Sequence, residues 1–188
     1  MRILGLFSVL VICLTVPTGN ASASDLRKGF SGIEWGTDLS VSDEFIRIRS
    51  REEVTFYRPV NKIYTIFDVD VSDVVFGSYD EKFFAVYMRI DSVEVFGRLK
   101  SHLISTFGKP ETRMSLKNKQ TIHKWEKGDI KIKLKVRENG NLMKLGFYYT
   151  PISGSINEAE QESFIENSPN FFPIERDKVP ERIPVFRF

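Results

Sequence analysis

An alternating run at residues 130–137 constrains the fold of this chain more than any other feature. Apolar residues occupy every second position from Ile130 to Val136, and lysine or arginine occupies the positions between them. Successive side chains of a β-strand point to opposite faces, so this run predicts a strand with one apolar and one basic face. Asn139 and Gly140 follow it, and this dipeptide favours a two-residue hairpin turn.

The hairpin turn determines which residues of the next strand lie opposite this run. A two-residue turn pairs the apolar positions of the two strands: Val136 with Met143, Leu134 with Leu145, and Ile132 with Phe147. On the preceding strand, a four-residue turn at 126–129 sets Trp125 opposite Ile130. A slip of one residue would expose all these side chains, so we expect a well-determined register. The predicted inner face holds Trp125, Ile130, Ile132, Leu134, Met143, Leu145, Phe147 and Tyr149.

A capped helix is expected over residues 92–107. Asp91 or Ser92 can cap its start, and Gly108 and Pro110 favour its end. Its apolar side chains recur at helical spacing: Phe96, Leu99, Leu103 and Phe107. We expect this helix to pack on the inner face of the sheet.

A second hairpin and a polar tail complete the predicted fold. Residues 73–79 and 83–90 are rich in β-branched and aromatic residues and flank a polar turn. Residues 157–167 carry four glutamates, and the last twenty residues hold four prolines. The fold class predicted is α+β: an antiparallel sheet packed on one main helix, with a C-terminal acidic helix and a proline-rich arm.

The N-terminus has the pattern of a secretory signal peptide. The apolar run Ile3–Val16 has about 14 residues, short of the roughly 20 that a spanning helix needs. The small residues Ala21, Ser22 and Ala23 follow it, so we expect cleavage near Ala23 and a periplasmic or secreted, not membrane-spanning, protein. The domains are then a signal peptide at 1–23, a folded domain at 24–150 and the arm at 151–188.

Cysteine usage agrees with export to a bacterial envelope. The single cysteine, Cys13, lies inside the predicted signal peptide, so the mature chain would have no disulfide, thiol nucleophile or cysteine-bound zinc. The remaining chain of about 165 residues is long enough for one domain without disulfides.

Positive charge is concentrated between residues 97 and 149, which hold 13 Lys or Arg against 4 Asp or Glu. Much of it falls on the outer face of the predicted meander, where strand spacing sets neighbouring ammonium groups roughly 5 to 7 Å apart. Like charges this close repel, so an anion beside them would be stabilised. We predict a basic sheet face as the binding surface: Lys124, Lys131, Lys133, Lys135, Arg137, Lys144 and Tyr148.

Two other interpretations of this face stay open. A lysine-rich face can simply be solvated and protect a sheet from aggregation. The segment after Thr150, with 7 acids against 4 bases, could instead cover the lysines or dock on another chain. Self-association through the arm is therefore a further possibility.

Catalytic and metal-binding patterns are sparse. The aspartates 68, 70 and 73 resemble the opening of a calcium loop, but position six is Asp73 where glycine is needed and position twelve is Tyr79 where glutamate is needed. His102 and His123 are the two histidines, and both fall near predicted apolar faces. We expect no catalytic residues, metal or cofactor, although a carboxylate pair such as Glu34 and Asp38 could still form an envelope hydrolase.

Three short motifs carry a family resemblance: Gly32-Ile-Glu-Trp-Gly-Thr37, Phe107-Gly-Lys-Pro110 and Lys124-Trp125. Their arrangement resembles small exported bacterial proteins with an early Gly-x-x-Trp-Gly element, over about residues 28–150. It is more distantly similar to outer-membrane-assembly lipoproteins of the SmpA/OmlA type, in which a helix and an antiparallel sheet form a protein-binding adaptor. This chain lacks the lipidated cysteine of those lipoproteins.

The function predicted is a non-catalytic exported binding or adaptor module. It would engage an envelope protein or an anionic lipid or glycan through the basic sheet face, and nucleic acid is a poor candidate for an exported chain. The competing hypothesis is the envelope hydrolase.

Overall fold

The computed structural model of the chain describes residues 26–116, 119–138, 142–154, 156–157 and 173–186. The predicted signal peptide and nearly all of the predicted acidic helix lie outside the described residues. In the described ranges, no helix is long and apolar enough to cross a membrane.

Of the residues that the structure describes, 51% are strand and 16% are helical, so the fold is mostly β and the predicted α+β class is wrong. The elements follow in this order: β1 (Gly29–Phe30), β2 (Ile33–Glu34), the 3-10 turn η1 (Leu39–Val41), β3 (Phe45–Arg51), β4 (Val54–Pro59), β5 (Lys62–Ile66), β6 (Val69–Asp70), β7 (Asp73–Tyr79), β8 (Lys82–Ile90), α1 (Val93–Phe107), β9 (Glu111–Ser115), β10 (Gln120–Lys127), β11 (Ile130–Arg137), β12 (Met143–Tyr149), α2 (Thr150–Ser153) and β13 (Glu181–Pro184). Strand predominates because the chain from residue 45 to residue 90 is almost all strand, while α1 is the one long helix described.

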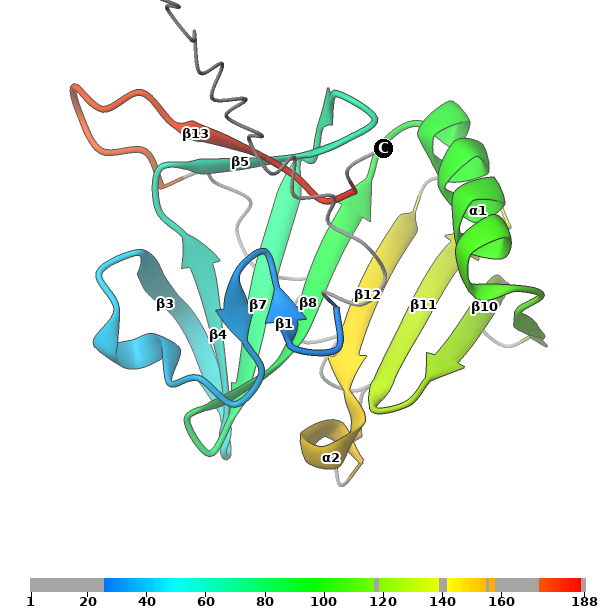
Figure 1. Cartoon of the computed structure of the whole chain (residues 1–188), viewed down its shortest axis with the longest axis horizontal. Coiled ribbons are helices and arrows are strands. Elements are labelled where there is room, and N and C mark those ends of the chain that lie inside the picture. The colour runs from blue at the N-terminus through cyan, green and yellow to red at the C-terminus, as the bar shows by residue number, and fades with distance from the viewer. Residues whose placement is uncertain (1–25, 117–118, 139–141, 155, 158–172, 187–188) are drawn as a thin grey trace, which may run out of the picture.

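An eight-stranded antiparallel sheet organises the molecule in the order β3-β4-β7-β8-β12-β11-β10-β9 (Figure 1). Two hairpin-built halves join where β8 pairs with β12, from Met143 opposite Ile90 to Tyr148 opposite Ala85. This pairing joins the predicted 73–90 hairpin to the predicted three-stranded meander. It also places Arg89 of β8 opposite Lys144 of β12.

The register of the β11–β12 hairpin is confirmed. Val136 lies opposite Met143, and the pairing continues to Ile130 opposite Tyr149. The predicted turn before β11 is wrong, because Trp125 lies opposite Ile132 rather than Ile130. A two-residue turn replaces the four-residue turn, since Gly128 adopts a φ of 60°, which glycine tolerates at no steric cost. The shift is two residues, so every side chain stays on its predicted face.

The predicted helix is confirmed as α1. Ser92 caps it by accepting a hydrogen bond from the Val95 N–H, and Gly108 ends it with a φ of 85°. Leu99 and Leu103 are fully buried in the main apolar cluster. In Figure 1, α1 and the β1–β2 hairpin lie in front of the sheet, and Phe30 of β1 belongs to the same cluster. This side is the inner face.

The other side of the sheet, the outer face, also carries an apolar cluster, centred on β4, β7 and β8. Its buried members are Val54, Phe56, Val75, Phe84, Ala85, Tyr87 and Tyr148. Ile152 and Ile156, in and just after α2, pack against it. The sheet is therefore apolar on both faces near its centre, which fits the nearly continuous apolar run of β8.

The described part of the C-terminal arm docks on its own domain. β13 pairs in parallel with β5, and β6 completes this three-stranded sheet. The Arg182 guanidinium donates two hydrogen bonds to the Asp70 carboxylate, at 2.8 and 3.0 Å. At the loop before β13, the Asn61 side chain accepts a hydrogen bond from the Glu175 N–H.

Candidate functional site

The predicted basic residues share the outer face of β10, β11 and β12. The register places Lys133 opposite Lys124 and Lys135 opposite Lys144. Lys131 lies opposite Tyr148. Because side chains opposite each other in antiparallel strands share a face, these groups lie together as the sequence predicted.

The row that contains Lys135 and Lys144 extends further than the sequence indicated. Lys144 lies opposite Arg89 of β8, and Arg89 lies opposite Asp73 of β7. Asp73 in turn forms an ion pair with Arg58 of β4, with an N–O distance of 2.9 Å. Positive groups thus run across β11, β12 and β8 to a buried ion pair. Sequence reasoning missed Arg89 because the β8–β12 pairing is not visible in local patterns.

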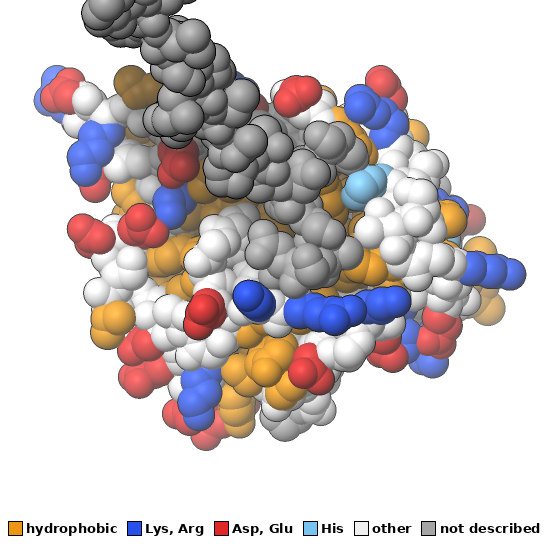
Figure 2. Space-filling view, viewed as in Figure 1, with side chains coloured by type: hydrophobic (Ala, Val, Ile, Leu, Met, Phe, Trp, Pro, Cys, Tyr) orange, Lys and Arg blue, Asp and Glu red, His pale blue; other side chains and the backbone are white. Residues whose placement is uncertain are grey.

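The basic sheet face is not an open surface. Lys135 is buried at 5% exposure, and Lys131, Lys133, Arg137 and Lys144 are half-buried. On the opposite side of the sheet, shown in Figure 2, acidic and basic side chains are interspersed around the rim. On the outer face of β10, β11 and β12, the basic side chains gather partly out of water, and Glu126 lies opposite Lys131 among them.

Tyr148 lies on the same face, opposite Lys131. It is 1% exposed, and its ring lies 5.6 Å from the Lys131 Nζ and 5.1 Å from the Lys133 Nζ. A ring face at this distance attracts ammonium groups through its quadrupole. The Tyr87 ring meets the Tyr148 ring edge-on at 5.6 Å between centroids. The lysines are therefore placed beside aromatic as well as charged groups.

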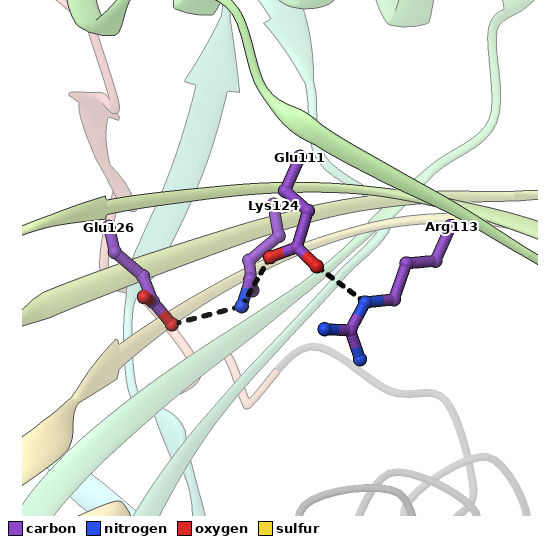
Figure 3. A network of polar contacts seen from close by, with 4 residues as sticks. All are labelled: Glu111, Arg113, Lys124 and Glu126. Atoms are coloured by element: carbon purple, nitrogen blue, oxygen red, sulfur yellow. Dashed lines mark hydrogen bonds and ion pairs between the residues drawn. The ribbon is translucent and has the colours of Figure 1, made fainter.

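Two carboxylates of its own sheet bind Lys124. Its Nζ lies 2.7 Å from Glu111 and 3.2 Å from Glu126, and Glu111 also binds Arg113 (Figure 3). The hydrogen bond from Lys124 lowers the pKa of the Glu111 carboxyl, and the same bond raises the pKa of Lys124. This network lies on β9 and β10, at the edge of the sheet.

The Arg58–Asp73 ion pair is the most buried charged contact described. Burial raises the pKa of the Asp73 carboxyl, and the attraction of Arg58, Arg89 and Lys144 offsets part of that rise. Burial also lowers the pKa of Arg58, which is 2% exposed. Desolvation therefore outweighs the attraction at both ends of the pair.

The aspartates that resembled a calcium loop are separated. Asp70 binds Arg182 within the three-stranded sheet, whereas Asp73 binds Arg58 within the eight-stranded sheet. Within the described ranges, no three acidic, histidine or cysteine side chains are grouped so that they could hold a metal ion.

The two histidines are packed into the structure. His123 is buried, and its Nδ1 lies 2.9 Å from the Thr112 hydroxyl. His102 of α1 meets the rings of Phe67 and Phe186 edge-on. Burial lowers the pKa of both imidazoles, so each is held neutral at pH 7.

Comparison with known proteins returns no relative. No family model matches the chain, and neither the curated proteins nor the solved structures contain a match. The resemblance to exported bacterial proteins and to the SmpA/OmlA type therefore stays a prediction.

Proposed function

We propose that the protein is a non-catalytic, exported binding module whose basic sheet face holds an acidic segment of a partner protein. The observation that carries this proposal is the set of like-charged cross-strand pairs: Lys133 with Lys124, Lys135 with Lys144, and Lys144 with Arg89. Export is proposed from the N-terminal sequence pattern.

The physical argument rests on charge and burial together. Neighbouring strands lie about 4.8 Å apart, so cations in one row repel each other. Partial burial strengthens that repulsion, because the surrounding protein screens charge less than water does. Lys135 is 5% exposed in the middle of its row. A face built in this way attracts further anionic groups.

A protein segment fits this face better than a lipid headgroup layer. The cations stand beside buried Tyr148 and Tyr87 and the outer apolar cluster, so the surface suits carboxylates interspersed with apolar side chains. A planar bilayer is attracted most by exposed lysines, whereas those of the basic sheet face are half-buried or buried.

The test measures binding of residues 24–188 to a labelled peptide of alternating glutamate and leucine, and to phosphatidylglycerol vesicles, across a salt series. The first variant combines Lys131→Glu with Lys133→Glu. The control combines Lys82→Glu with Lys127→Glu, which are exposed lysines and change the net charge equally. We expect salt-sensitive peptide binding that the first variant weakens roughly tenfold, about 1.4 kcal/mol.

The outcomes separate the alternatives. Equal weakening in both double variants would show that only net charge matters, and would contradict the proposal. Binding to vesicles without binding to the peptide would replace the protein partner with anionic lipid. Thermal unfolding of each variant shows whether a loss of binding reflects a loss of fold.

The described carboxylates support the hydrolase hypothesis less well than the binding proposal. A glycoside-cleaving pair needs one acid that stays protonated beside a second carboxylate. Glu111 and Glu126 instead flank the Lys124 ammonium, which lowers the pKa of Glu111. Asp73 has a raised pKa, but its partner is Arg58.

A further inference from the structure

The strand β9 forms one edge of the eight-stranded sheet. It pairs with β10 on one side, and in the described part of the chain no strand pairs with its other side. An edge strand presents backbone N–H and C=O groups to which another strand can pair. This edge adjoins the basic sheet face, because Glu111 of β9 binds Lys124.

The edge strand β9 is short and carries two charged side chains, but it lacks a β-bulge. Its register with β10 runs without a bulge from Ser115 to Glu111, and Pro110 lies outside the strand. The opposite edge strand, β3, has an irregular register between Arg47 and Arg49. Bulges of this kind twist an edge away from partners, so β9 is the more open of the two edges.

Apolar side chains beside this edge are exposed. Met114 is 71% exposed and Leu116, just after the strand, is 84% exposed. The charged side chains of β9 are exposed as well, with Glu111 and Arg113 on the same face of the strand (Figure 3). A partner strand could therefore contact both kinds of side chain without displacing anything described.

We propose that β9 pairs with β9 of a second copy of this chain, antiparallel, around a two-fold axis at Thr112. In an antiparallel pair, side chains directly opposite each other lie on the same face of the sheet. The two-fold axis must therefore pass beside one residue of each strand, because an axis between two residues would set side chains of opposite faces against each other. An axis at Arg113 sets two arginines opposite each other, which is unfavourable. An axis at Met114 sets Arg113 opposite the partner's Ser115, and the residue that would then face Glu111, Lys117, lies beyond the end of β9.

The axis at Thr112 satisfies the charges of the strand. Glu111 lies opposite the partner's Arg113, and Arg113 lies opposite the partner's Glu111. Met114 then lies opposite the partner's Pro110, and the symmetry repeats this contact, so the exposed Met114 side chain of each copy is covered. The two eight-stranded sheets become continuous, and two basic sheet faces lie in one surface. A contact of one short strand per chain is small, so the dimer is expected to be weak and concentration-dependent.

The test uses sedimentation equilibrium of residues 24–188, which contain every described element, over a wide concentration range. Arg113→Glu alone sets acid opposite acid in the dimer, and Glu111→Arg alone sets base opposite base. Each variant is expected to lose association roughly tenfold or more. Mixed together, the two single variants again oppose acid to base, so we expect a heterodimer at least as stable as the parent dimer.

The matched control is Glu34→Arg, an exposed charge reversal on β2. It is expected to leave association unchanged, and far-UV circular dichroism checks the fold of all variants. A parent chain that stays monomeric at every concentration would overturn the proposal. Association that neither single variant weakens, or that the mixture does not restore, would also overturn it, because a dimer through the C-terminal arm behaves in that way.

Discussion

The ring of Tyr148 lies against the backbone of Gly146, two residues earlier on β12. An ideal Cβ built at position 146 would stand 2.8 Å from the Cε2 and the hydroxyl oxygen of that ring. Real Cβ atoms essentially never come this close to another heavy atom. Because Tyr148 is almost fully buried, its ring has little space into which it can move. Glycine at position 146 therefore leaves room for the Tyr148 ring in the position where it lies beside both Lys131 and Lys133.

Gly146→Ala is expected to destabilise the protein by about 1–3 kcal/mol, the usual cost of overpacking a buried site. Urea denaturation measures this free energy of unfolding. In a Tyr148→Ala background, the same substitution should cost less than about 0.5 kcal/mol, because the clashing ring is absent. If Gly146→Ala costs the same free energy of unfolding in both backgrounds, position 146 is sensitive for a reason other than the ring.

Gly128 gives a prediction about backbone conformation alone. Its φ is 60°, and nothing lies within 4 Å of a Cβ built there. Gly128→Ala is expected to cost about 1 kcal/mol because a Cβ disfavours this left-handed region, and Gly128→Asn should cost less. The control is Gly97→Ala in α1, which also has space for a Cβ and should stabilise by up to about 1 kcal/mol. Thermal unfolding that moves in the same direction for both alanine variants would contradict this account.

The features that the sequence predicted are those set by neighbouring residues. Alternation at 130–137 and the dipeptide Asn139–Gly140 predicted the β11–β12 register, which is confirmed although the turn itself lies outside the described residues. Ser92 and Gly108 predicted the ends of α1. The turn at Gly128 was misjudged by two residues, because both turn lengths keep the apolar side chains on the same face.

The features that the sequence did not predict depend on distant residues. The β8–β12 pairing joins segments more than fifty residues apart, and it alone sets Arg89 beside Lys144. Ala85, Tyr87 and Arg89 occupy alternate positions and lie on one face of β8. The sequence pattern therefore showed that Arg89 shares a face with them, but not which strand lies beside it. Burial of the basic sheet face was also missed, since a strand pattern shows which side chains share a face and not what lies against them.

The ion pair between Arg58 and Asp73 should depend on both partners being present. Asp73→Ala leaves a guanidinium that is 2% exposed without this carboxylate, and is expected to destabilise the protein by about 3 kcal/mol or more. The double variant Arg58→Met with Asp73→Leu removes both charges and should recover most of that loss. Urea denaturation of the three chains measures the coupling. A double variant as unstable as Asp73→Ala would show that Arg58 itself is required.

Two histidines, the buried His123 and the half-buried His102, make stability depend on pH. Burial lowers the pKa of His102 and of His123, and nearby Lys100 lowers that of His123 further. An unfolded histidine keeps its usual pKa near 6.5, so between the two values the unfolded chain binds more protons than the folded chain. Stability is therefore full above pH 6.5 and falls as the pH falls toward the lowered values.

The free energy of unfolding should thus decrease from pH 7.5 to pH 5, and the double variant His102→Gln with His123→Gln should show a smaller decrease. Comparing the two chains at each pH cancels the contribution of Asp73, whose raised pKa acts in the opposite direction. Glu111 does not interfere, because its lowered pKa moves its titration further below this range. Urea denaturation at half-unit pH steps gives both curves. Parallel curves for the parent and the double variant would show that neither imidazole is held neutral by burial.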